Sequence, residues 1–301
     1  MVNPLSNPPD YGMLVPMSPL VARVTAKNPS AYTFTGTGTY IIGTTDLAII
    51  DPGPMDEAHK EALLAAINNR PVKAILVTHT HSDHSTLAPW LAKKTKAQTY
   101  GFGPHGCGKR AGLEGEEVEA GADLSFIPDV FIKDGNLIKG DGWTIEAIHT
   151  PGHTSNHICY ALKEDNAIFT GDHIMRWATT VISPPDGDMR AYLDSLKKIM
   201  DRDSAILYPT HGKAVTKPYR YINALIGHRR QREHQIIKML SQGHTQIMDI
   251  VQKLYKDVDP RLHIAASRSV FSHLIMLVED GSVTTTSPLR IENRFYLTNT
   301  P

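Results

Sequence analysis

Six consecutive residues, His79-Thr80-His81-Ser82-Asp83-His84, hold four side chains that could bind a metal ion. They follow the short apolar run 72–78, which predicts a buried strand. The spacing does not match one helix face, where ligands would recur at i and i+3 or i+4. It is typical of a loop that directs side chains toward two neighbouring points. Imidazole nitrogens and carboxylate oxygens are good Zn²⁺ ligands, so the motif predicts a metal site.

Further candidate ligands stand directly after other predicted strands, at Asp51, His153, Asp172 and His211. His153 follows a Pro-Gly pair, and a tight turn of that kind presents a ligand. Two nearby histidines, His149 and His157, are interpreted as structural, while His173 stands beside Asp172. Loops at strand ends are a common place for chemistry, so these residues are candidates for the rest of a binuclear site.

In chain order, HxHxDH, the Gly-His turn, a strand-end Asp and a strand-end His-Gly resemble the metallo-β-lactamase superfamily over about residues 31–212. The C-terminal part, with the segment GHRRQRE, resembles the β-lactamase-like-protein-2 branch, which is related to glyoxalase II and includes endoribonucleases. The resemblance implies an α+β chain with three parts: a lead-in at 1–30, an αββα four-layer catalytic domain at 31–216, and a winged-helix-like domain at 217–301.

The resemblance also implies site roles, residue by residue. The first metal would be held by His79, His81 and His153, and the second by Asp83, His84 and His211. Asp172 would bridge both metals, and Asp51 would orient the site through hydrogen bonds. Two Zn²⁺ ions are expected, with iron or manganese as alternatives. A bridging carboxylate favours the glyoxalase II, ribonuclease and lactonase side of the superfamily over true β-lactamases.

On this basis the chain is expected to be a hydrolase whose metal-bridging hydroxide attacks an ester-type or phosphodiester bond. Asp83 or Asp172 would shuttle the proton, and no Ser or Cys nucleophile is needed, so Cys107 and Cys159 are interpreted as structural thiols. Cys107 with its neighbour His105 is too sparse a pair to predict another metal site.

Three functions stay open at this stage. The first is an endoribonuclease that acts on single-stranded RNA. The second is a small-molecule acyl hydrolase, such as a thioesterase of glyoxalase II type, a lactonase or a weak β-lactamase. The third is a metal-bearing protein that binds nucleic acid or a partner. Two positions differ from the branch: Thr80 stands where an aromatic residue is common, and Thr210 where glycine is common. Both differences are expected to reshape the pocket.

The charge of the chain is distributed unevenly. All 301 residues hold 31 Lys and Arg and 31 Asp and Glu, which excludes strong whole-chain attraction to nucleic acid or to an acidic membrane. Residues 1–212 hold 18 basic and 24 acidic residues, whereas residues 213–301 hold 13 and 7. The basic excess includes a group on one predicted helix: Arg229, Arg230, Arg232 and Lys238. Contact with an anionic partner and an ordinary solvated face are both open, and a winged helix also serves as a packing or dimerisation module.

The remaining patterns predict the elements that position these residues. Helices are expected at 55–69, at 85–96 with Ser85 as N-cap, and at 189–201. Beyond His211, three helices, one with Thr245 as N-cap, and a two-stranded ribbon suggest the winged helix. Residues that could contact the site from nearby are Ser155, Asn156, Trp177 and Tyr208, although Tyr208 fits a strand core better.

The apolar runs are short compared with the roughly 20 residues of a membrane span, so no membrane association is expected. No signal peptide is evident at the N-terminus. With two cysteines, a disulfide framework is not predicted, and a reducing cytoplasmic environment is the expectation.

Overall fold

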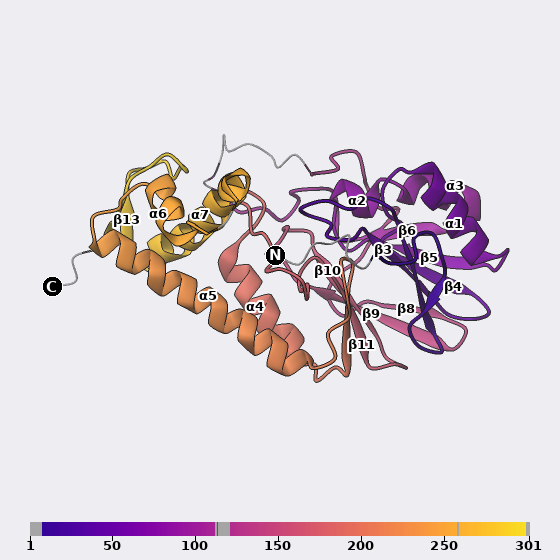
Figure 1. Ribbon diagram of the computed structural model, residues 1–301. Helices are drawn as coiled ribbons and strands as arrows, with labels where there is room; N and C mark the ends of the chain where they lie inside the picture. The colour runs from indigo at the N-terminus through magenta and orange to yellow at the C-terminus, as the bar shows by residue number, and fades with distance from the viewer. Residues whose placement is uncertain (1–7, 112, 114–120, 258, 299–301) are drawn as a thin grey trace.

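Two sheets face each other at the centre of the chain, and helices cover both outer faces (Figure 1). The structure is a computed structural model that describes residues 8–111, 113, 121–257 and 259–298. The first sheet has seven strands in chain order: β1 (Val15–Pro16), β2 (Val21–Thr25), β3 (Gly38–Ile42), β4 (Leu47–Ile50), β5 (Val72–Leu76), β6 (Gln98–Gly101) and β7 (Val130–Phe131). Pairing is antiparallel from β1 to β4 and parallel from β4 to β7.

The second sheet has five strands in the spatial order β12-β11-β10-β9-β8. They are β8 (Leu137–Gly140), β9 (Trp143–His149), β10 (Ile158–Leu162), β11 (Ala167–Gly171) and β12 (Ile206–Pro209). β11 and β12 are parallel, and the other pairs are antiparallel. Between the sheets lies a core of large buried side chains, including Tyr40, Trp143, Tyr160 and Phe169. Their burial removes much apolar surface from water and so holds the two sheets together.

Helices complete the four layers. α1 (Glu57–Ile67) and α3 (Ala88–Thr95) cover the outer face of the first sheet through a core that includes Leu63 and Leu91. α4 (Met189–Met200) covers the second sheet and buries Tyr192 and Leu196. The N-caps of α1 and α4 are Asp56 and Asp188, whose carboxylates accept hydrogen bonds from backbone N–H groups of the first turn. The expected αββα fold is confirmed.

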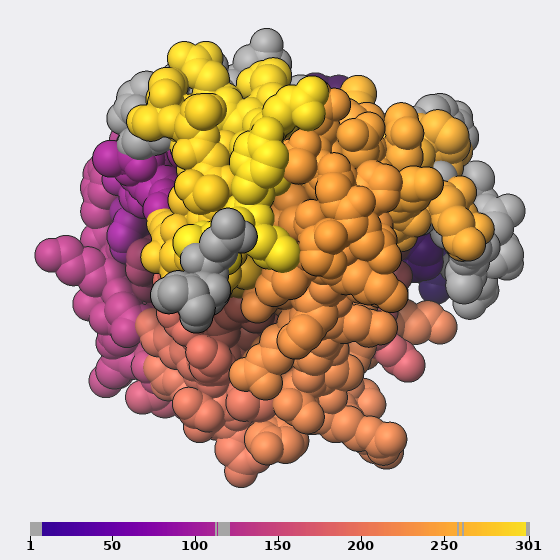
Figure 2. All heavy atoms as spheres, turned by 90° about the vertical axis from the view of Figure 1, so that its left-hand side faces the viewer, coloured from indigo at the N-terminus to yellow at the C-terminus, as the bar shows by residue number. Residues whose placement is uncertain are grey.

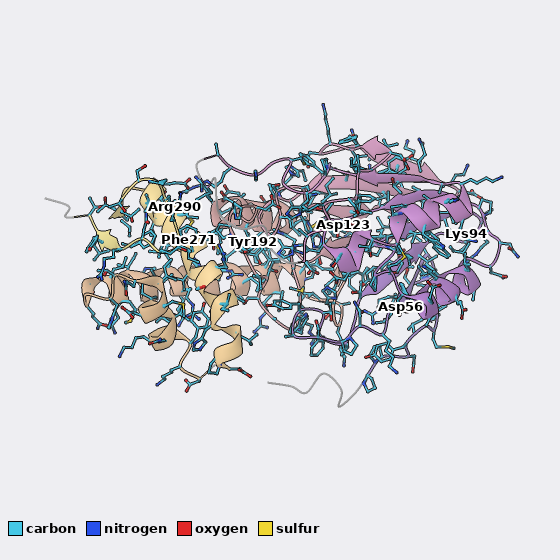
Figure 3. All side chains as sticks on the ribbon, turned by 90° about the horizontal axis from the view of Figure 1, so that it is seen from above. Asp56, Lys94, Asp123, Tyr192, Phe271 and Arg290 are labelled. Carbon is cyan, nitrogen blue, oxygen red and sulfur yellow. The ribbon has the colours of Figure 1, made fainter. Side chains whose placement is uncertain are left out.

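The C-terminal part consists of α5 (Pro218–Ser241), α6 (Ile247–Leu254), the short helix η2 (Pro260–Leu262), α7 (His263–Glu279) and the antiparallel ribbon β13 (Val283–Thr285) with β14 (Phe295–Leu297). It has its own core around Phe271 and Phe295. Figure 2 views the molecule from this end, which orange and yellow residues largely cover. Figure 3 shows Phe271 in this part and Asp56 in the helices at the opposite end, with Tyr192 between them. The expected winged helix is confirmed.

Four expectations about elements are wrong in detail. The lead-in contributes β1 and β2 to the first sheet, and its residues 1–7 lie outside the described residues. Residues Ser82–Ser85 form a helical turn, α2, rather than a pure loop. Ser85 ends that turn instead of capping a helix, because its hydroxyl donates to the backbone oxygen of His81 and to Asp123. The N-cap of α6 is Gln246 rather than Thr245. No helix in the described part of the chain is long and apolar enough to cross a membrane.

Candidate metal centre

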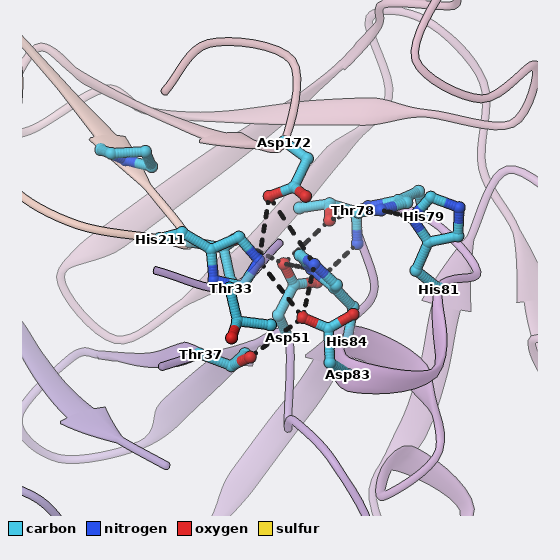
Figure 4. Close-up of polar contacts among 12 residues, drawn as sticks. Thr33, Thr37, Asp51, Thr78, His79, His81, Asp83, His84, Asp172 and His211 are labelled. Atoms are coloured by element: carbon cyan, nitrogen blue, oxygen red, sulfur yellow. Dashed lines mark hydrogen bonds and ion pairs between the residues drawn. The ribbon is translucent and has the colours of Figure 1, made fainter. Parts of the chain in front are cut away.

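The strand ends of both sheets meet at one edge of the molecule. Asp51 and His79 follow β4 and β5, which are parallel neighbours, and Asp172 and His211 follow β11 and β12, which are parallel as well. Carboxyl ends of parallel strands lie at the same edge of a sheet, and the face-to-face stacking then brings the two edges together. The turn after β9 adds His153. All seven expected metal ligands therefore lie within one cluster. Figure 4 labels His79, His81, Asp83, His84, Asp172 and His211 within it.

The first ligand group consists of His79, His81 and His153. Nε2 of His79 lies 2.9 Å from Nδ1 of His81, and Nε2 of His153 lies 3.1 Å from the same atom. Two ligand atoms of a tetrahedral Zn²⁺ ion with bonds of about 2.0–2.1 Å lie roughly 3.3 Å apart. The three nitrogens are therefore spaced as ligands of one ion.

The second ligand group consists of Asp83, His84 and His211. Oδ2 of Asp83 lies 3.4 Å from Nε2 of His84 and 3.2 Å from Nε2 of His211. Oδ1 of Asp172 faces this group, 3.3 Å from Nε2 of His211, whereas Oδ2 of Asp172 faces the first group, 3.9 Å from Nε2 of His153. The two oxygens of Asp172 thus point to different groups, as a bridging carboxylate requires.

Two buried atoms that lie at ion-pair distances but make no hydrogen bond among the described residues test whether metal ions fit here. Nε2 of His84 and Oδ1 of Asp172 are buried and make no hydrogen bond within the described part of the structure. Leaving such atoms unsatisfied costs about 1–3 kcal/mol each. Both atoms point into the second ligand group, so a bound cation would satisfy both. The donor set, five histidines and two carboxylates, fits Zn²⁺ and related transition metals.

Hydrogen bonds to the outer ring nitrogens fix how four histidines present Nε2 to the centre. Nδ1 of His79 donates to the hydroxyl of Thr78, and Nδ1 of His84 donates to Asp51. In the same way, Nδ1 of His153 and of His211 donate to backbone oxygens of residues 181 and 36. An N–H on the outer nitrogen leaves the inner nitrogen as the lone-pair donor, which a metal ligand must be.

Asp51 orients the second ligand group, as expected. Its buried carboxylate accepts from Nδ1 of His84 at 2.8 Å, from the backbone N–H and hydroxyl of Thr78, and from the hydroxyl of Thr210. The residue adopts a left-handed backbone conformation, with φ of 49°, which Asp tolerates better than most residues. Four hydrogen bonds thus lock the carboxylate against His84.

We expect Asp51→Asn to weaken metal binding at the second group by about 10–100-fold. The amide nitrogen that replaces one carboxylate oxygen is a donor, and it would face groups that already donate. A competition titration against a chromophoric chelator measures the loss. The matched control Asp194→Asn changes an exposed carboxylate on α4 and should bind metal like the wild type. Equal affinities in both variants would contradict the orienting role of Asp51.

Charges differ between the two ligand groups in the metal-free protein. Burial, with the neighbouring His84, His81 and His153 as further causes, holds the pKa of His79 well below its usual value. Burial would also lower the pKa of His84, but Asp83, Asp51 and Asp172 outweigh it and raise the pKa to about 9. His211 behaves alike: its pKa is raised despite burial, because of Asp172 and Asp83. At pH 7 His79 in the first group is therefore neutral, as a metal ligand must be, whereas His84 in the second group holds a proton.

Proton release should therefore distinguish the two ligand groups. A metal ion that fills the second group at pH 7 must displace a proton from His84, whose pKa is about 9, and the raised pKa of His211 favours further proton release. We expect affinity at the second group to rise as the pH increases from 7 toward 9, while occupancy of the first group changes less. Calorimetry in buffers of different ionisation enthalpy counts the released protons. Equal release from both binding events would contradict the prediction.

The residues expected to contact the site from nearby differ in where they lie. Asn156 contacts the metal-ligand loop, since its amide donates to the hydroxyl of Thr80. Tyr208 packs in the core against Tyr40 and Phe169, away from the centre, so the core interpretation is confirmed. Trp177 is half-buried and stacks on the ring of Phe34.

Four residues interpreted as structural, two histidines and two cysteines, lie outside the ligand groups found among the described residues. His149 stacks on Phe102, and the buried His157 lies against the ring of His79. Burial raises the pKa of the Cys159 thiol to about 12, so the structural interpretation of this cysteine fits. Cys107 is exposed. Its neighbour His105 also belongs to none of the ligand groups in the described part of the chain.

Four threonines make hydrogen bonds around the centre that the sequence did not predict. The hydroxyl of Thr37 donates to Oδ2 of Asp83, and the hydroxyls of Thr78 and Thr210 donate to Asp51. Thr80 accepts from Asn156 and contacts His105. Three of the four stand directly before a ligand histidine, which was a visible signal. Thr80 and Thr210, the two residues that differ from the β-lactamase-like-protein-2 branch, thus both make hydrogen bonds near the centre.

Arg229 is buried rather than part of a basic surface. Its side chain leaves α5 and donates to the backbone oxygen of Thr180, and its guanidinium lies 5.2 Å from the ring centre of Tyr192. The hydroxyl of Thr180 donates in turn to the backbone oxygen of Asp172 at 2.8 Å. The backbone oxygen of Val181, the residue after Thr180, accepts a hydrogen bond from Nδ1 of His153. Through Arg229, the C-terminal part therefore supports the loop that begins at Asp172 and orients His153.

We expect Arg229→Met to lower the free energy of unfolding by about 1.5–3 kcal/mol, because it removes a charged hydrogen bond from a buried carbonyl. Metal affinity at the first group should fall as well, since the loop that orients His153 loses its support. Urea unfolding and the chelator titration measure the two effects. The neighbouring exposed residue supplies the control: Arg230→Met should change stability by no more than about 0.5 kcal/mol. Identical behaviour of the two variants would contradict the supporting role.

A cluster of histidines and carboxylates that could hold metal ions, at the edge of an αββα fold, defines a class of metal-site proteins, and sequence comparison identifies the family. Residues 32–211 match the metallo-beta-lactamase superfamily, and residues 247–288 match the beta-lactamase associated winged helix domain. The chain belongs to the metallo-beta-lactamase superfamily.

Among its relatives is a protein of Caenorhabditis elegans named beta-lactamase-like protein 2 homolog. It is 31% identical over 277 residues, which cover 89% of this chain and 87% of that one. An Aspergillus fumigatus protein named atrochrysone carboxyl ACP thioesterase is 32% identical over 239 residues, covering 77% of this chain and 68% of that one. A solved structure of a beta-lactamase domain protein from Burkholderia ambifaria matches with a TM-score of 0.77 and 20% identity, over 98% of this chain and 96% of that one. That structure supports the fold alone.

Proposed function

We propose that this chain is a binuclear metal-dependent hydrolase that cleaves thioesters. The observation that carries the proposal is Asp172, whose two oxygens face the two ligand groups separately. A carboxylate in that position holds two metal ions close together, which suits hydrolysis by a water placed between them. The complete set of seven ligand side chains argues against a mere scaffold role.

The residues of the chain have distinct parts in this proposal. His79, His81 and His153 would hold one ion, and Asp83, His84 and His211 the other, with Asp172 shared. Two Zn²⁺ ions bound there would supply an activated water and a Lewis acid for the substrate carbonyl.

Asp83 is suited to moving the proton. Its side chain is 22% exposed, more than that of His84, His211 or Asp172. We infer that it takes a proton from the attacking water and returns one to the leaving thiolate. The hydroxyl of Thr37 holds Oδ2 of Asp83 in place through a 3.0 Å hydrogen bond.

The relatives support a thioester as the substrate class. Several proteins about 30% identical to this chain carry the name atrochrysone carboxyl ACP thioesterase. A thioester carbonyl is attacked at carbon, and its thiolate leaves readily, so no further acid is needed to cleave it.

Cleavage of single-stranded RNA is the second candidate. It rests on the basic excess of residues 213–301 and on Arg230 and Lys238, which remain exposed on α5. Arg229 no longer supports it, because that side chain is buried.

A screen of the zinc-loaded protein tests the proposal. Acyl-pantetheine thioesters, a lactone, a β-lactam and a single-stranded RNA are compared at equal concentration. The thioesters should be hydrolysed fastest, and a chelator should abolish the reaction. His81→Ala should remove the activity as well. No thioester turnover, or turnover that ignores the chelator, would overturn the proposal, and metal-dependent RNA cleavage in its place would favour the second candidate.

A further inference from the structure

A cavity of about 180 Å³ lies beside the first ligand group. Its walls include His105, Lys109, Leu124, Pro185 and Asp186. At about 30 Å³ for each molecule, this volume corresponds to roughly six waters. The cavity is therefore too small for a whole drug-sized ligand, but it can take one short arm of a substrate.

Hydrogen bonds connect the cavity walls to the metal-ligand segments. Nδ1 of His105 lies 3.0 Å from the hydroxyl of Thr80, and its ring centre is 6.3 Å from that of His81. Oδ2 of Asp186 accepts from the backbone N–H of Ser155, which stands two residues after His153. An arm in this cavity would thus extend from a group that reacts at the metal centre.

Asp186 is the unusual group in the cavity wall. The side chain is 6% exposed, and its Oδ1 atom has no hydrogen-bond partner in the described part of the structure. Nε2 of His105 lies 3.8 Å from the other oxygen, Oδ2. A buried carboxylate that lacks donors is costly, and a ligand that donates an O–H or N–H group to it lowers the cost.

The remaining walls define the character of the arm. Leu124 is 68% exposed and Pro185 is apolar, so part of the lining suits methylene groups. Lys109 is exposed and carries an ammonium group, which suits a carbonyl oxygen or a carboxylate. The combination fits a short, partly apolar arm with one donor and one acceptor.

We propose that this cavity is a substrate subsite that binds a donor-bearing arm next to the scissile thioester, with Asp186 as the residue that determines specificity. The inference rests on the proposed thioesterase function. The carboxylate of Asp186 accepts the hydrogen bond of the arm, and Lys109 contacts its oxygen. Two sources share this chemistry, a hydroxyl on the acyl chain and an amide N–H of a pantetheine-type thiol.

Four thioester substrates distinguish the acyl hydroxyl from the amide of the thiol as the hydrogen-bond donor. Butyryl and 3-hydroxybutyryl groups are each joined to pantetheine and to hexanethiol, and kcat/KM is measured with the zinc-loaded wild type. We expect the donor-bearing acyl group or the donor-bearing thiol to raise kcat/KM by at least about tenfold, because one buried hydrogen bond is gained. A higher kcat/KM for 3-hydroxybutyryl than for butyryl thioesters identifies the hydroxyl as the donor. A higher kcat/KM for pantetheine than for hexanethiol thioesters identifies the amide.

Variants then test Asp186 itself. In Asp186→Ala the ratio of kcat/KM between the donor-bearing and the donor-free substrate should fall to about one. Asp186→Asn keeps the size and one acceptor oxygen, so it covers the case in which the alanine variant folds poorly, and it should retain part of the preference. As a readout apart from activity, saturation-transfer NMR should show weaker binding of free pantetheine or 3-hydroxybutyrate to the zinc-loaded Asp186→Ala protein. The exposed surface variant Asp201→Ala serves as the control.

The outcomes separate the two proposals. Equal kcat/KM for all four thioesters, or a preference that survives in Asp186→Ala, would overturn the subsite and leave the thioesterase proposal intact. If the wild type hydrolysed none of the four, the thioesterase proposal would fail, and the subsite would fail with it.

Discussion

Asp172→Asn is expected to reduce thioester turnover by on the order of a thousandfold. The wild-type carboxylate presents Oδ1 to the second ligand group and Oδ2 to the first. An amide has one oxygen and one NH₂ group, so it can serve only one group as an acceptor. The side chain keeps its size, and the fold should remain.

Steady-state kinetics of the zinc-loaded variant measure this loss, and unfolding by urea checks that the protein is intact. The exposed control Asp201→Asn should leave kcat/KM unchanged. Metal content should fall toward one equivalent in Asp172→Asn, because the second group loses a ligand atom. Activity within tenfold of the wild type would show that Asp172 does not bridge two ions.

Removal of metal is expected to have a large effect as well, this time on stability. Ions that bind the folded chain and not the unfolded chain stabilise it by about 4.1 kcal/mol each at a free concentration of a thousand times Kd. Two ions would then contribute about 8 kcal/mol. We therefore expect a chelator to lower the melting temperature strongly and addition of Zn²⁺ to restore it.

Two substitutions assign this stabilisation to the ligand groups. His81→Ala removes a ligand of the first group, and His211→Ala removes one of the second. Each variant should bind about one equivalent of zinc by elemental analysis and keep roughly half of the gain in stability. His149→Ala changes a histidine outside the groups and should bind the full amount of metal. One equivalent in the wild type itself would refute a binuclear centre.

Much of the fold was predictable because the local signals agree with it. The run at 189–201 predicted α4, which spans Met189–Met200, and the run at 72–78 predicted β5, which spans Val72–Leu76. The errors arose where tertiary contacts overrule local signals. Ser85 resembles a cap by type, yet its hydroxyl bonds to Asp123, which is distant in sequence.

The sequence by itself determined the identities and order of the candidate ligands, because each stands in a short motif directly after a strand whose apolar run is plain. Only the tertiary structure decided what surrounds them. Arg229 looked like its neighbour Arg230 in the sequence, but the face of α5 that packs against Tyr192 buries it. Asp186 acquired its significance in the same way, from a cavity whose walls come from separate loops. Burial is a property of distant partners, so no local pattern of residues contains it.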